Sequence, residues 1–107
     1  MKVTEKVGKN NSYVVVLEDY YGSGYSSAFY EAIKNKVAPQ KIKKVDVEVS
    51  LGSSEYEIFF TKDTIEVKVE IDDFGPVAFI LKENVSQGKE KVYEWATNAG
   101  DEVAKLQ

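Results

Sequence analysis

The stretch 44–71 alternates apolar and polar side chains with a period of two, and this rhythm constrains the fold more than any other feature. Successive side chains of a β-strand point to opposite faces, so each alternating run predicts a strand with one apolar and one polar face. Gly52-Ser53-Ser54 and Lys62-Asp63 interrupt the alternation and predict two turns. The apolar positions are Val45, Val47, Val49 and Leu51, then Tyr56, Ile58 and Phe60, then Ile65, Val67, Val69 and Ile71. The stretch therefore predicts an antiparallel meander of three strands.

Further strands are predicted on both sides of the meander. Residues 13–18 and 77–82 are rich in β-branched and aromatic residues and apolar on both faces, which is typical of central strands. Residues 1–11 contain a short candidate strand around Val3 and Val7, so they form either an extra edge strand or a flexible start. Asn10-Asn11-Ser12 is a turn signal.

Helical spacing of apolar residues predicts two helices. The first runs from a capping Ser26 or Ser27 to about Val37, and Pro39 prevents its continuation. The second covers residues 89–106, and Gly100 inside it allows an end or kink near Asn98-Ala99-Gly100. Its apolar stripe consists of Val92, Trp95, Ala96, Ala99, Val103 and Leu106.

These elements predict one α+β domain over residues 1–107. We expect a single antiparallel sheet of five strands, or six with the edge strand, in the order strand, helix, four strands, helix. Both helices should pack on one face of the sheet. This element order is similar to that of the halves of the TATA-box-binding protein and of the helix-grip domains, and the likeness implies the architecture alone.

The residue types that are missing exclude several kinds of chemistry. The chain has no Cys and no His, and all 14 of its basic residues are Lys. Zinc sites with thiolate or imidazole ligands, Cys-His or Ser-His nucleophilic pairs and a histidine base are therefore excluded. Without Arg there is also no guanidinium fork for phosphate or carboxylate. Any catalysis would use Asp, Glu, Lys, Tyr, Ser or Thr, and we expect no cofactor.

Charge and hydropathy limit the partners. The net charge is −4, from 18 acidic and 14 basic residues, which disfavours direct binding to a nucleic-acid backbone. No apolar run reaches the roughly 18 residues that a membrane helix needs. Residues 1–10 lack the apolar core of a signal peptide, so a cytoplasmic location is expected.

The first candidate site is the charged face of the predicted meander. Such a face could dock a basic partner or imitate the phosphates of nucleic acid; otherwise it is a solvated face that keeps the sheet soluble. Phe59 should also point to this face, where an exposed aromatic ring would be an interface anchor. The predicted acidic members are Asp46, Glu48, Glu55, Glu57, Glu66 and Glu70, with Lys68 among them.

The second candidate site is a loop in which Tyr20, Tyr21 and Tyr25 flank Gly22-Ser23-Gly24. Tyrosine with glycine and serine is typical of recognition loops, although two of the three rings could instead pack at the edge of the core. The acid pairs Glu18-Asp19 and Asp72-Asp73 could serve acid–base or metal chemistry, but turn residues that bind their own backbone are the favoured interpretation.

Three hypotheses for function remain open. The favoured one is a non-enzymatic module that binds a protein partner, by analogy with inhibitors, immunity proteins and phage or plasmid accessory proteins; a free edge strand would also allow a homodimer. The second is a carrier of a small apolar ligand in a cavity between sheet and helices. The third is an enzyme that uses carboxylates, with or without a metal. The cavity of the second hypothesis would be lined by Phe29, Tyr30, Phe60, Phe79 and Trp95.

Overall fold

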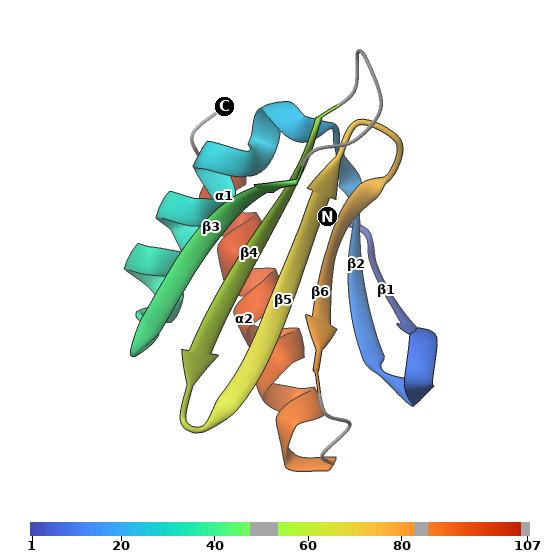
Figure 1. The fold of residues 1–107 in the computed structure, drawn as a ribbon, viewed down its shortest axis with the longest axis vertical. Helices are drawn as coiled ribbons and strands as arrows, with labels where there is room; N and C mark the ends of the chain where they lie inside the picture. Colours follow the sequence, from blue (N-terminus) through green and yellow to red (C-terminus); the bar gives the residue numbers. More distant parts are fainter. Residues whose placement is uncertain (48–53, 83–85, 106–107) are drawn as a thin grey trace.

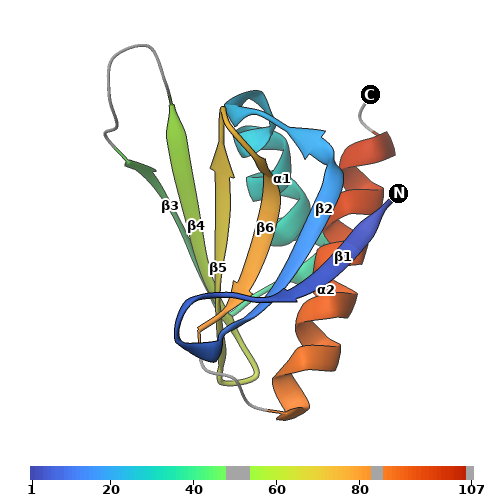
Figure 2. The same ribbon diagram turned by 90° about the vertical axis from the view of Figure 1, so that its right-hand side faces the viewer.

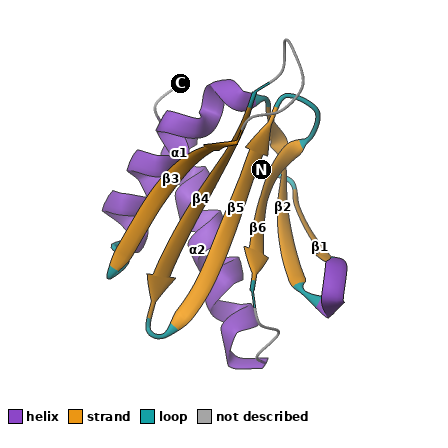
Figure 3. Cartoon of the chain, in the orientation of Figure 1, coloured by secondary structure: helices purple, strands orange, loops and turns teal. Residues whose placement is uncertain are grey.

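The computed structural model describes residues 1–47, 54–82 and 86–105, which form a six-stranded antiparallel sheet with helices on one face (Figures 1 and 3). The order of strands across the sheet is β1-β2-β6-β5-β4-β3. The predicted fold class is confirmed, with the edge strand present. The strands are β1 (Val3–Val7), β2 (Tyr13–Tyr21), β3 (Lys41–Val47), β4 (Glu55–Lys62), β5 (Ile65–Asp72) and β6 (Pro76–Leu81).

Two helices cover the sheet from one side, and we call the opposite side the outer face (Figure 2). Helix α1 (Ser26–Ala32) continues into a π-helical turn (Ile33–Val37) and stops at Ala38, whose φ of 53° is left-handed, before Pro39. Helix α2 spans Ser86–Lys105, so it does not end near Gly100. Within the described chain, no helix has both the length and the apolar character needed to span a bilayer.

Aromatic rings fill the layer between sheet and helices. Phe29 packs edge-on against Phe79, which in turn packs against Phe60, with ring centroids 6.2 and 6.4 Å apart. Trp95 of α2 packs against Phe60 at 5.9 Å. Edge-to-face contacts of this kind stabilise a core beyond the burial of area. Four of the five side chains proposed to line a ligand cavity therefore pack against one another, and Tyr30 packs at their border.

The register of β3 differs from the prediction. Val45 lies directly opposite Glu57 and Asp46 opposite Tyr56, so Val45 and Val47 share the outer face with the glutamates. Asp46 consequently points to the helix side, and its predicted place on the acidic face is wrong. The reason is that β3 is an edge strand that pairs only with β4, so its polar side chains reach solvent from either face. Residues 48–53, and with them Glu48, lie outside the described chain.

A β-bulge in β2 reverses the alternation of its side chains. Leu17 pairs with Val77 but Tyr21 pairs with Pro76, so residues 18–20 have no direct partner on β6. Tyr20 turns into the core as a result, and its hydroxyl donates a hydrogen bond to the carbonyl oxygen of Gly100, 2.7 Å away. The predicted tyrosine loop is therefore the end of a strand followed by a 3₁₀ turn (Ser23–Tyr25) that leads directly into α1.

The tip of the β1–β2 hairpin lies on the outer-face side of the sheet (Figure 2). Asn10 and Asn11 adopt left-handed φ angles of 58° and 59°, which asparagine tolerates well. Gly8 packs so closely that a Cβ there would lie 2.9 Å from Val14 Cγ2 and 2.7 Å from Ser12 Oγ. The tip therefore forms a raised wall beside the sheet.

Candidate functional site

Two neighbouring rows of side chains cross the outer face, and strand pairing fixes both. The lysine row has lysines at its two ends and its centre, with apolar side chains between them. The glutamate row lies two residues further along each strand and has two opposed glutamates near its middle. The lysine row is Lys43, Phe59, Lys68, Ile80, Val14 and Lys6, and the glutamate row is Val45, Glu57, Glu70, Ala78, Val16 and Thr4.

A groove of about 610 Å³, which we call the outer groove, runs over the middle of these rows. Its floor is apolar and its walls are charged. The hairpin tip forms one wall, and side chains of β4, β5 and the end of β6 form the other. The floor consists of Val14, Phe59, Ala78 and Ile80, and the walls of Lys6, Gly8, Lys9, Asn10 and Ser12 on one side and Glu57, Lys68, Glu70 and Lys82 on the other.

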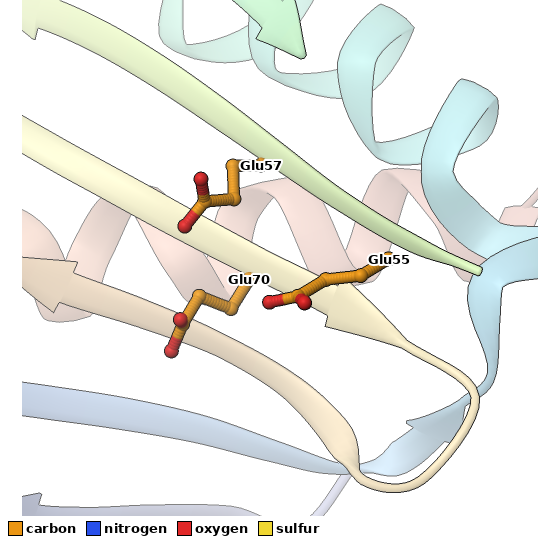
Figure 4. A group of neighbouring side chains, drawn as sticks. All are labelled: Glu55, Glu57 and Glu70. Carbon is orange, nitrogen blue, oxygen red and sulfur yellow. The ribbon is translucent and has the colours of Figure 1, made fainter. Parts of the chain in front are cut away.

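Carboxylates of β4 and β5 gather on the outer face, and two of them, Glu57 and Glu70, line the groove (Figure 4). Glu55, Glu57 and Glu70 each place an oxygen within 4.8 Å of the others. The ammonium of Lys68 lies 3.5 Å from Glu57 and 3.6 Å from Glu70. Partial burial raises the pKa of Glu55, the charges of Glu57, Glu70 and Asp72 raise it further, and Lys68 opposes them.

The cluster offers oxygen ligands of the kind that Mg²⁺ or Ca²⁺ accepts. Lys68, however, already places a positive charge against two of the three carboxylates. The protein itself thus compensates part of the negative charge, and we describe the cluster as a charged rim of the groove. Carboxylates placed in this way can attract a cationic group electrostatically.

The outer face is less uniformly acidic than the sequence predicts. Glu55, Glu57, Phe59, Glu66 and Glu70 do lie on it, because each is paired in register across β4 and β5. Sequence reasoning missed the lysines that face them, namely Lys6, Lys9, Lys43 and Lys82. Lys6 belongs to β1, Lys9 to the hairpin tip and Lys82 to the end of β6. These lysines lie beside the glutamates because β6 pairs between β2 and β5 in the sheet.

The tyrosine loop is largely part of the core. Tyr20 is 5% exposed, and the Tyr25 ring packs edge-on against it at 5.2 Å. Tyr21 alone of the three is well exposed, at 58%. The alternative in which two of the rings pack inward therefore describes this segment. The nearby Phe74, in the turn between β5 and β6, is 79% exposed and was not predicted as a site residue.

The acid pairs bind backbone N–H groups. Asp73 accepts hydrogen bonds from the backbone N–H and hydroxyl of Ser23 and from the N–H of Ser54, and these bonds lower the pKa of its carboxyl. Asp72 accepts one from the N–H of Phe74 at 2.8 Å, and Asp19 accepts one from the N–H of Lys2 at 2.9 Å. Among these bonds, that of Asp72 is the local turn contact that the favoured interpretation predicts, whereas Asp73 and Asp19 bind segments between 17 and 50 positions away in the sequence.

No match to this chain was found among models of protein families, curated proteins or solved structures.

Proposed function

We propose that this protein is a non-catalytic module that binds a partner protein on the outer face of its sheet, with the outer groove at the centre of the contact. The observation that carries the proposal is the apolar floor of the groove, formed by Val14, Phe59, Ala78 and Ile80, on the face opposite both helices. Charged side chains of both signs surround that floor.

This arrangement resembles the anatomy of protein–protein interfaces, in which an apolar centre is surrounded by a polar rim. Phe59 is half-buried at the centre and lies opposite Lys68, a position that suits an aromatic anchor. The net charge of −4 on the whole chain disfavours nucleic acid as the partner. The packed aromatic layer between sheet and helices gives the apolar-carrier hypothesis less support.

A homodimer and a cytoplasmic location remain predictions. The free edge strand β3 carries Lys41, Lys43 and Lys44. Lysines on an edge strand disfavour pairing of that edge with a second sheet. The partner that we propose is therefore a different protein held on the face of the sheet.

The test is an affinity capture from the native host with quantitative mass spectrometry. Phe59→Lys places a charge on the apolar floor and should abolish capture of the partners that the wild-type protein retains. Tyr93→Lys is the matched control, because Tyr93 is an exposed aromatic of α2, on the helix side of the molecule, and it should leave capture unchanged. Both variants are first checked for wild-type thermal unfolding.

Unchanged capture by folded Phe59→Lys would count against the outer groove. Phe74→Lys forms a third arm, since Phe74 is exposed in the turn between β5 and β6. Loss of the partner in that variant alone would move recognition from the groove to this turn.

A further inference from the structure

We infer that the outer groove takes an amphipathic α-helix of the partner protein, with basic side chains at the end over Glu55, Glu57 and Glu70 and acidic side chains at the end over Lys6 and Lys9. This inference rests on the proposed function and specifies the partner of the same surface. Hydrogen bonding, shape and charge each support one part of it.

The backbone of the groove floor has no free edge. Strands β2, β6, β5 and β4 are each paired on both sides within the sheet, so their N–H and C=O groups already bond to neighbouring strands. An extended segment laid on this floor would find no backbone partners for its own polar groups. A helix satisfies its backbone internally and presents only side chains, which is the usual mode of binding in an apolar groove.

The floor matches one face of such a helix. Its apolar side chains come from four neighbouring strands and lie between raised, charged walls. A helix with apolar residues at spacings of three and four presents one continuous stripe and keeps its polar residues at the sides. That stripe would lie on Phe59, Ile80 and Ala78, and the charged ends of the helix would meet the two walls.

The charges of the groove are sorted along a diagonal of the sheet. Lys6 and Lys9 lie on β1 and its hairpin tip, whereas Glu57 and Glu70 lie on β4 and β5, one row further along the strands. Neighbouring strands are about 4.8 Å apart and rows two residues apart about 7 Å, so three strand spacings make the step across the sheet the longer one. A helix that crosses the strands obliquely therefore meets carboxylates at one end and ammonium groups at the other. The partly positive N-terminus of the helix should lie over the carboxylates.

The test uses two synthetic peptides of identical composition with the same apolar stripe. The sorted peptide carries lysines in its N-terminal half and glutamates in its C-terminal half, and the mixed peptide alternates them. Lactam bridges hold both helical, as circular dichroism checks. With the wild-type protein in low salt, we expect calorimetry to show about tenfold tighter binding of the sorted peptide. The difference should shrink at high ionic strength.

Substitutions at the carboxylate end test the orientation. The double variant Glu57→Gln, Glu70→Gln should reduce the advantage of the sorted peptide to about twofold, because it removes the charges that attract the lysines. The matched control is Glu31→Gln, Glu90→Gln, two exposed glutamates of the helices, and it should keep the full difference. Phe59→Lys should abolish binding of both peptides.

Equal affinities for the two helical peptides would refute the claim that the partner's charges are sorted along its length. Equal affinity for a proline-containing, extended version of the sorted peptide would refute the claim that the partner binds as a helix. Absence of binding by either peptide also overturns the inference. In each of these cases the proposed function stands if partner capture still depends on Phe59, and it falls with the inference if capture does not.

Discussion

Lys68 lies at the centre of the lysine row and contacts the glutamates of the next row. Glu57 and Glu70 are directly opposite each other on β4 and β5, a placement of like charges that is unfavourable by a few tenths of a kcal/mol. Lys68 offsets this repulsion through its two ion pairs. Glu55 forms no ion pair with Lys68 in this cluster. The repulsion that Lys68 does not offset is therefore the repulsion between Glu55 and the carboxylates around it.

Replacing Glu55 by glutamine should therefore stabilise the protein at neutral pH. The pKa of Glu55 is raised in the folded state, so the carboxyl favours folding when protonated and opposes it as the pH rises through that raised pKa. We expect Glu55→Gln to raise the free energy of unfolding by roughly 0.5 kcal/mol at pH 7. Urea unfolding at pH 7 and in acid measures this, and the gain should vanish in acid.

Glu66→Gln is the control for that prediction. Glu66 is exposed on the neighbouring strand β5 but pairs with Lys82 at 3.6 Å, so its removal should bring no gain. A lower free energy of unfolding for Glu55→Gln at pH 7 would show that Glu55 makes a favourable interaction instead.

Asp73 should have the opposite pH dependence. Hydrogen bonds from Ser23 and Ser54 lower the pKa of its carboxyl, so its contribution to stability is present above the unfolded pKa and is lost as the pH falls through the folded one. Asp73→Ala should lower the melting temperature at pH 7, and the difference from wild type should narrow in acid. Asp46→Ala, at an exposed aspartate of β3, is the control and should change little. A pH-independent difference would assign the effect of Asp73 to packing.

At the scale of elements, the turn between β4 and β5 carries backbone strain. Lys62 pairs with Ile65, and the two residues between them have positive φ angles, 51° at Asp63 and 66° at Thr64, as a type I′ turn requires. A β-branched residue is unfavourable in this conformation. Thr64→Gly should therefore raise the free energy of unfolding by about 0.5–1 kcal/mol, as chemical denaturation can measure.

Thr4→Gly provides the matched comparison, because Thr4 has ordinary strand geometry in β1. The same substitution there should destabilise the protein, since glycine loses more conformational freedom on folding. Destabilisation by both substitutions would mean that the turn holds Thr64 without strain.

The hairpin tip that walls the groove depends on Gly8. A Cβ at this position would meet side-chain atoms of Val14 and Ser12 at distances below 3.0 Å, so Gly8→Ala must displace either these side chains or the tip itself. Overpacking of this kind costs roughly 1–3 kcal/mol. Gly24→Ala is the control, because a Cβ at Gly24 has no described atom within 4 Å. Thermal unfolding should separate the two variants, and equal melting temperatures would show that the tip yields without cost.

The sequence predicted most elements because a local pattern fixes each of them. The alternation in β4 and β5 is reliable, since both strands are paired on both sides and have one face under the helices. It failed in β3, where Ile42 packs against the core but Lys44 and Asp46 on the same face are exposed, and at Tyr20, where a bulge reverses the faces. The lysine row could not be predicted, because it needs the order of strands that are distant in the sequence.

At the scale of the whole molecule, net charge is a poor guide to the binding surface. The chain carries −4 overall, yet four lysines and two glutamates line the outer groove. Acidic and basic groups are sorted by position on the sheet, and a partner responds to that local pattern more than to the total. The sequence predicted a mainly acidic docking surface. The structure instead places lysines at one part of the groove and glutamates at another.

The hydrogen bond between Tyr20 and Gly100 joins residues 80 positions apart. During translation, β2 therefore leaves the ribosome long before the helix that covers it. Until α2 emerges, α1 alone covers the helix side of the sheet, and Phe60 lacks Trp95, the ring of α2 against which it packs. A nascent chain arrested before α2 should be a client of chaperones that recognise exposed apolar segments, and the domain should close only after this helix has been synthesised.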